Sequence, residues 1–133
     1  MTKILSGNSI RLKHAAISNP NLSSSHIDSI LDSTTALIGL KHGAIKHPNA
    51  TSKQLHDVLS NHKIPGVREA ALKNPNITSD HLKTALHDPE PGIRYAAISH
   101  PKVTDEHIKI AMEDDDSKVV YKAMKRDAEI NPQ

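Results

Sequence analysis

One stretch decides the fold: Pro-Gly-Val-Arg-Glu-Ala-Ala-Leu-Lys-Asn-Pro, residues 65–75, which returns as Pro-Gly-Ile-Arg-Tyr-Ala-Ala-Ile-Ser-His-Pro at residues 91–101. Looser copies flank both. The prolines that close the copies are spaced by 28, 27 and 26 residues: Pro20, Pro48, Pro75 and Pro101. Self-similarity at such a period is typical of proteins built from stacked structural repeats. We therefore expect a single repeat domain over 1–133, with units at about 10–36, 37–64, 65–90 and 91–117 and a partial unit at 118–130.

Each unit reads as two short helices. In the third unit Val67 to Asn74 reads as a short helix: Val67, Ala70, Ala71 and Asn74 follow helical spacing, and Leu72 points to a second side, as expected for a helix packed between others. Pro65 and Gly66 before it read as turn residues. Pro75 ends this helix, because a residue before proline is pushed out of the α region. Thr78 then caps a second helix that runs to about Asp88. In the last unit we expect a first helix from Val119 to Arg126.

The same positions recur in four units. The N-caps expected for the second helices are Ser23, Thr51, Thr78 and Thr104. The apolar pairs spaced as hydrophobic staples around these caps are Leu22–Ile27, Ala50–Leu55, Ile77–Leu82 and Val103–Ile108. The small residues that let first helices approach closely are Ala15/Ala16/Ile17, Gly43/Ala44/Ile45, Ala70/Ala71/Leu72, Ala96/Ala97/Ile98 and Lys122/Ala123/Met124. Agreement of caps, staples, breakers and core predicts an all-α fold.

On these residues the chain resembles the HEAT-like α-solenoids, and more closely their leucine-rich repeat variant. The matching runs are Val-Arg-x-Ala-Ala-Leu-x-Asn-Pro-Asn-x-Thr at 67–78 and Ile-Arg-x-Ala-Ala-Ile-x-His-Pro at 93–101. The resemblance covers about residues 10–126 and implies a right-handed α-solenoid of four to five two-helix units that binds macromolecules. The first two units depart from the pattern, with Lys13 and Lys41 in place of the arginine.

Composition excludes several classes of protein. No apolar stretch approaches the ~18 residues of a membrane span, and the segment before Ser9 lacks the apolar core of a secretory signal. There is no cysteine, so disulfides and the cysteine-ligated iron–sulfur module of some leucine-rich repeat variants are absent; a cytoplasmic location is the expectation. The net charge of +2 is small for a nucleic-acid-binding protein. We expect no cofactor.

Two recurring polar positions invite a functional reading. His26, His81 and His107 share one position in the unit, with Gln54 as its fourth member. Neighbouring units lie roughly 10 Å apart, too far for one metal ion to bridge, and the position is N3 of a capped helix. We therefore predict capping and no metal site. The second position holds Lys13, Lys41, Arg68 and Arg94. It fits structural ion pairs, with Arg94 opposite Asp88, better than a phosphate-binding stripe.

A third row is expected to be exposed and is the candidate partner-binding surface. It runs along the first helices and comprises Lys46, Lys73, Tyr95, Tyr121, Lys125 and Arg126. The adjacent row is Asn19, His47, Asn74, His100 and Arg126. The outer side of the second helices carries mixed charges instead: Asp28, Asp57, Lys83, Lys109 and Glu113. One sign of charge with two tyrosines makes the better interface.

The sequence therefore predicts a non-enzymatic protein–protein interaction module, an adaptor or an inhibitor, with no small-molecule substrate and no membrane partner. The alternative is a HEAT-like solenoid that contacts a nucleic-acid backbone through its lysine row. An enzyme ranks last. Some HEAT-like solenoids are DNA glycosylases that hold an extruded base with aromatic side chains, and this chain has no Trp and no Phe.

Overall fold

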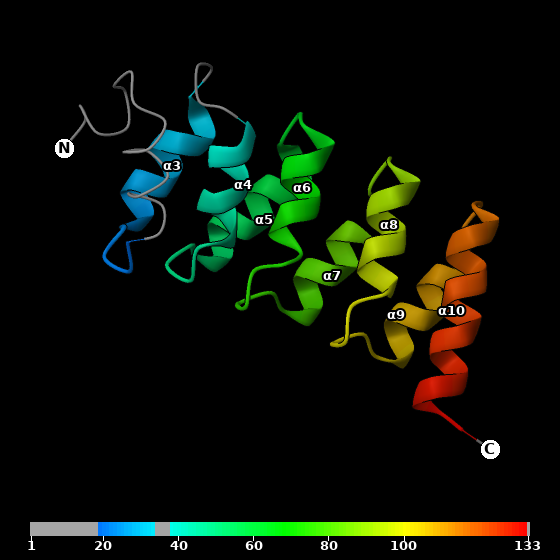
Figure 1. The fold of residues 1–133 in the computed structure, drawn as a ribbon. Coiled ribbons are helices and arrows are strands. Elements are labelled where there is room, and N and C mark those ends of the chain that lie inside the picture. The colour runs from blue at the N-terminus through cyan, green and yellow to red at the C-terminus, as the bar shows by residue number, and fades with distance from the viewer. Residues whose placement is uncertain (1–18, 34–37, 133) are drawn as a thin grey trace.

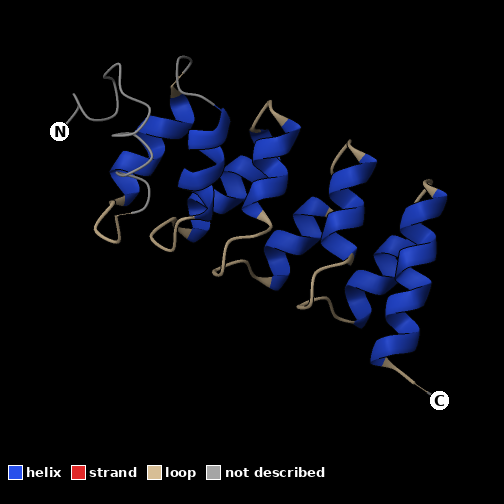
Figure 2. Cartoon of the chain, viewed as in Figure 1, coloured by secondary structure: helices blue, strands red, loops and turns tan. Residues whose placement is uncertain are grey.

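The computed structural model describes residues 19–33 and 38–132, and in these residues it holds eight α-helices and no strand (Figure 2). The all-α prediction is confirmed for this part of the chain. The helices are α3 (Ser24–Asp32), α4 (Ile38–Lys46), α5 (Ser52–Asn61), α6 (Pro65–Ala71), α7 (Ser79–Ala85), α8 (Pro91–Ile98), α9 (Asp105–Met112) and α10 (Ser117–Ile130). The expected helix around Ala15 and Ala16 and the basic-row residue Lys13 lie outside the described residues.

The helices form two rows that advance together from α3 to α10 (Figure 1). One row holds α4, α6, α8 and α10, here called the first helices, and each of them packs against the next. The other row holds α3, α5, α7 and α9, the second helices. Each first helix also contacts a second helix beside it in the sequence. The contacts are therefore local, and the core is a continuous layer between the two rows rather than a central ball.

Aliphatic and alanine side chains fill this layer, as the composition requires. Ile27, Leu55, Leu82 and Ile108 occupy the same position in their units and are at most 3% exposed. Both members of every predicted staple are buried. On the first helices Ala44, Ala71, Ala97 and Ala123 are fully buried, so small side chains lie where neighbouring helices meet. The core predicted from the spacing is confirmed at these positions.

The caps are confirmed as well. Ser23, Thr51, Thr78 and Thr104 are the N-cap residues of α3, α5, α7 and α9, and each forms a capping box with its N3 side chain. Two orphan amides at the start of each helix are thereby satisfied.

The predicted boundaries of the first helices are wrong at both ends. Pro65 and Pro91 are the first residues of α6 and α8, not turn residues, and Gly66 and Gly92 are inside the helices. Proline suits the first helical position because its fixed φ is helical and its missing N–H has no partner there anyway. At the other end α6 stops at Ala71, earlier than the predicted Asn74. The second helix of the same unit, α7, also ends early, at Ala85 instead of Asp88.

The last helix is longer than predicted. It runs from Ser117 to Ile130 instead of from Val119 to Arg126. Asp127 stands where the earlier units have Pro48, Pro75 and Pro101, so nothing interrupts the helix at that point.

Candidate interaction surface

The first-helix edge is defined here as Lys46, Lys73, Tyr95, Tyr121 and Lys125, and all five residues are exposed. Lys46 ends α4, Lys73 follows α6, Tyr95 lies on α8, and the other two lie on α10. Tyr95 and Tyr121 are 41% and 63% exposed; among the other large apolar residues described, only Ile38, Met124 and Ile130 are also exposed. The predicted residues thus follow one row of helices.

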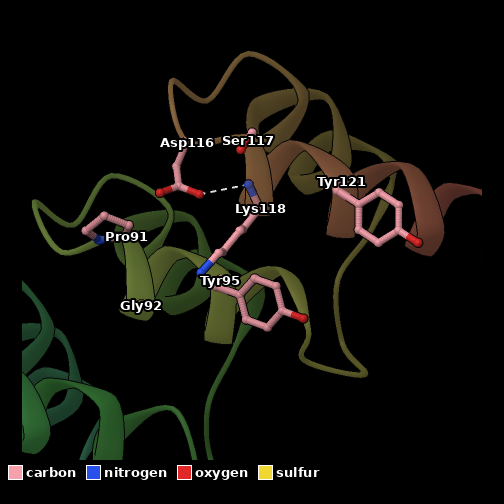
Figure 3. A pocket seen from close by; sticks show the side chains of 7 residues that line it. All are labelled: Pro91, Gly92, Tyr95, Asp116, Ser117, Lys118 and Tyr121. Carbon is pink, nitrogen blue, oxygen red and sulfur yellow. Dashed lines mark hydrogen bonds between the residues drawn. The ribbon is translucent and has the colours of Figure 1, made fainter.

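The structure brings only part of this edge together. Tyr95 and Tyr121 border a single hollow between α8 and the start of α10 (Figure 3). We call it the tyrosine hollow and define it by its lining: Pro91, Gly92, Tyr95, Asp116, Ser117, Lys118 and Tyr121. Lys46 and Lys73 are not part of it.

Lysine side chains surround the two rings. The ammonium of Lys122 lies 6.0 Å from the centre of the Tyr95 ring, and that of Lys125 lies 6.0 Å from the centre of the Tyr121 ring. Lys118 extends from α10 toward the α8 side of the hollow (Figure 3). A cation over an aromatic face is attracted by the negative potential of the ring. The lining of the hollow therefore combines two tyrosine rings with the ammonium of Lys118 and the carboxylate of Asp116, and the ammonium groups of Lys122 and Lys125 lie beside the rings.

The nearest carboxylates are engaged elsewhere. Asp116 is the N-cap of α10 and accepts hydrogen bonds from the amides of Lys118 at 2.8 Å and Val119 at 3.4 Å. Asp114 and Asp115 form ion pairs with Arg94. Among the described residues no carboxylate lies within ion-pair distance of Lys118, Lys122 or Lys125. Positive charge at this end of the edge is thus unpaired.

Sequence reasoning missed Lys118 as a site residue and gave Lys122 no site role. Both break the repeat: Lys118 stands where earlier units have Gly66 and Gly92, and Lys122 stands where they have glycine or alanine. A lysine that replaces a small residue in one unit only was the signal. Arg126, by contrast, lies between units. Its side chain is 16% exposed, donates to the carbonyl of His100 and pairs with Glu129.

The row next to the edge joins each unit to the one before. His47 Nε2 donates to the carbonyl of Asn19 at 2.8 Å, and Asn74 Nδ2 donates to the carbonyls of Ile45 and His47 at 2.6 and 2.9 Å. Arg126 makes the same kind of contact at the last unit. Because these side chains already donate hydrogen bonds to the backbone, fewer donors remain for a ligand.

The arginines are structural, as predicted, but one partner was assigned wrongly. Arg68 forms a two-point ion pair with Asp88 at 2.8 and 3.1 Å, and Arg94 forms one with Asp114 at 2.8 and 3.2 Å. With Asp88, Arg94 makes only one hydrogen bond, which its guanidinium donates to the backbone carbonyl at 2.7 Å. Each arginine therefore reaches forward to the carboxylate 20 residues later, and the Asp88 carboxylate already belongs to Arg68.

Electrostatics at Asp114 follow from this pairing. Burial acts to raise the pKa of Asp114, but the hydrogen bonds from Arg94 and from the Asp116 amide outweigh it, so the net pKa lies below the usual range. The same hydrogen bond raises the pKa of Arg94. Both groups stay charged.

The histidines at the N3 position cap their helices, as predicted, and they also contact the preceding unit. Nδ1 of His81 accepts the Thr78 amide at 3.0 Å, while Nε2 lies 3.1 Å from the carbonyl of Ser52 in the preceding unit. His107 repeats both contacts with Thr104 and Ser79. The tautomer with hydrogen on Nε2 satisfies both contacts. In the described part of the chain no three His, Asp or Glu side chains converge on a position that would hold a metal ion.

The second-helix face differs from the edge. Lys83 pairs with Glu106 at 2.7 Å and Lys53 with Asp57 at 3.4 Å, so two of its lysines are neutralised locally. A second hollow near its start is lined by Asp28, Asp32 and Asp57 among others. The first-helix edge therefore carries unpaired lysines, whereas the second-helix face carries paired lysines and a group of carboxylates.

Within the described ranges, no helix has the length and apolar character that crossing a membrane requires. The chain matches no protein-family model, no curated protein and no solved structure.

Proposed function

We propose that the chain is a protein-binding module without enzymatic activity, and that it engages its partner through the first-helix edge. The observation that carries the proposal is the pair of exposed tyrosines, Tyr95 and Tyr121, set among unpaired lysines. Tyrosine and basic side chains anchor many protein interfaces, because they bury large area and still reach polar groups.

We further propose that the two rows of helices are a right-handed α-solenoid of four to five HEAT-like units of the leucine-rich repeat variant kind. Equivalent contacts at equal or nearly equal spacing support this. The Arg68–Asp88 and Arg94–Asp114 pairs each span 20 residues, and the His81 and His107 contacts span 29 and 28. Repeat stacks of this kind offer long, rigid surfaces and bind macromolecules along them.

A nucleic-acid partner is the second candidate, favoured by the lysines beside the tyrosine rings. Bases stack on tyrosine and phosphates pair with lysine. Two observations weigh against it. The net charge is only +2, and the position of Tyr95 is held by Glu69 in the preceding unit, so neither the aromatic row nor the positive charge continues along the edge. An enzymatic, glycosylase-like role is the least favoured.

Partner capture from the native host, followed by charge reversal, tests the proposal. The affinity of the identified partner is measured for Lys46→Glu with Lys73→Glu, and for the matched pair Lys83→Glu with Lys109→Glu on the second helices. We expect the first pair to weaken binding and the second pair to leave it nearly unchanged. The opposite result moves the binding face to the second helices. Binding that weakens steeply between low and high salt favours nucleic acid.

A further inference from the structure

We propose that the tyrosine hollow is a docking site for a short, extended, acidic peptide segment that carries one compact apolar side chain. The inference rests on the proposed function. It identifies the part of the first-helix edge that contacts the partner and the chemistry of that contact.

The floor of the hollow is open and close to the backbone. A Cβ added at Gly92 would meet no atom within 4 Å, so space lies directly over the start of α8. The ring of Pro91 and the rings of Tyr95 and Tyr121 line this space (Figure 3). An apolar side chain placed over Gly92 would enter a hollow that these rings line. A proline or another compact apolar residue fits such an aromatic-lined groove better than a long flexible one.

The charge around the hollow selects an acidic partner. Lys118 lines the hollow, and Lys122 and Lys125 lie 6.0 Å from the centres of its two tyrosine rings; none of these lysines has a carboxylate within ion-pair distance in the described residues. Asp114 and Asp115 pair with Arg94, and Asp116, the one carboxylate in the lining, accepts from the amides that open α10. Aspartate or glutamate on either side of the apolar residue would meet those ammonium groups. Charge complementarity of this kind steers association and rejects basic competitors.

The extent of the hollow favours a short peptide over a nucleic-acid strand. It spans two units only. In the unit before, Glu69 takes the place of Tyr95, and next to it Ser99 interrupts the row of Lys73 and Lys125. A strand that tracks a protein by its phosphates needs a continuous basic path with aromatic platforms along it.

The test uses a phage library of random 12-residue peptides selected on the full chain. Peptides that emerge are measured against five proteins: the parent, Gly92→Leu, Lys118→Glu with Lys122→Glu, Lys46→Glu with Lys73→Glu elsewhere on the first-helix edge, and the matched control Lys53→Glu with Lys109→Glu. A Cβ at Gly92 meets no atom within 4 Å, so Gly92→Leu adds an apolar side chain at the hollow without a clash at its Cβ, and a thermal melt verifies that the variant is folded. Fluorescein-labelled (dT)20 is measured in parallel.

We expect selected peptides to be acidic with one apolar residue between the acids. Their affinity should fall by about tenfold or more in Gly92→Leu and in the hollow charge reversal, and by less than about twofold in the control. Resonances of Gly92, Tyr95 and Tyr121 should shift when such a peptide is added to isotope-labelled protein.

Several results would overturn the inference. Neutral or basic peptides, failure to select any peptide, or affinity unchanged in Gly92→Leu each exclude the hollow as a site for acidic peptides. If affinity falls only in Lys46→Glu with Lys73→Glu, the hollow is wrong and the first-helix edge stands. If it falls only in the second-helix control, both proposals fail. Tight (dT)20 binding that the hollow charge reversal abolishes, with no peptide selected, replaces the peptide with a single-stranded nucleic acid.

Discussion

At the scale of single residues, a few polar side chains do two tasks at once. His81 closes the capping box of its own helix with one ring nitrogen and reaches the carbonyl of Ser52 with the other. Gln54 does the same with its amide: Oε1 accepts from Thr51 N at 2.9 Å and Nε2 donates to Ser24 O at 2.7 Å. Chemically different side chains thus serve one position because each offers an acceptor and a donor that point to different partners.

This equivalence predicts that His81→Gln is tolerated and that His81→Ala is not. Alanine leaves the Thr78 amide and the Ser52 carbonyl without these partners, and His81 is 3% exposed. We expect His81→Ala to lower the free energy of unfolding by about 1–3 kcal/mol, the cost of buried groups left unsatisfied. His81→Gln should lose clearly less. Urea denaturation of the three proteins measures this, and equal losses for both variants would contradict the shared role.

The buried ion pair gives a second prediction. The side chains of Arg68 and Asp88 are 10% and 1% exposed. Asp88→Ala leaves the guanidinium buried without its carboxylate, and we expect a loss of about 3–5 kcal/mol in unfolding free energy. Replacing both, as Arg68→Met with Asp88→Leu, should recover most of it, because no buried charge remains. Glu106→Ala, at the exposed Lys83–Glu106 pair, is the control and should change stability little. A double variant as unstable as Asp88→Ala would argue against unpaired charge as the cause.

Acid sensitivity is the third prediction. Burial, with help from Lys102 and Arg126, lowers the pKa of His100 below 6.5 in the folded protein. The unfolded chain then binds more protons as pH falls below 6.5, so this group's contribution is complete above that pH and declines beneath it. His100→Asn, which copies Asn74 at the equivalent position, should match the parent at pH 7 and lose less stability toward pH 5. Denaturation midpoints of parent and variant at pH 7 and pH 5 test this prediction. Equal losses of stability in the two proteins would exclude His100 as a source of the acid sensitivity.

At the scale of helices, the sequence predicts well those features that recur at the same position in every unit. Caps, staples and the Ala-Ala contacts follow from spacing and are found as expected. The failures lie where one unit departs from the rest or where a residue's meaning depends on a neighbouring unit. The partner of Arg94 is set by the next unit, and Lys118 lines a hollow only because α8 lies beside it. Neither is visible within a single unit.

The length of α10 gives the prediction that belongs to this scale. Asp127→Pro restores the proline that closes earlier units, and we expect the helix to stop near Met124, as α8 stops three residues before Pro101. The Asn131 side chain, which bonds Asp105 and Asp127, should come free. Amide hydrogen exchange should speed up after Met124 and stay unchanged in α8. Asp127→Ala is the control and should keep the helix; slow exchange retained in the proline variant would refute the account.

At the scale of the whole molecule, order along the stack decides which side chains matter for stability. A helix between two neighbours buries both of its apolar sides, and the last helix has one side without a described neighbour. The position held by Ile45, Leu72 and Ile98 is buried in α4 and in the first-helix segments of the next two units, but its equivalent Met124 is 58% exposed. The same chemical position therefore contributes differently according to its place in the stack.

Two truncations of similar size make this testable. Leu86 is 3% exposed at the end of α7 and lies in the middle of the stack, so Leu86→Ala should lower the free energy of unfolding by about 2–5 kcal/mol. Met124→Ala removes a mostly exposed side chain from α10 and should stay within about 0.5 kcal/mol of the parent. Chemical denaturation with a shared slope gives both values. Equal midpoints for the two variants would mean that the end of α10 is covered or that Leu86 is not packed, and either result would contradict the stack as described. A large loss at Met124 alone would point to an association of chains through this end, which a concentration dependence of the midpoint would reveal.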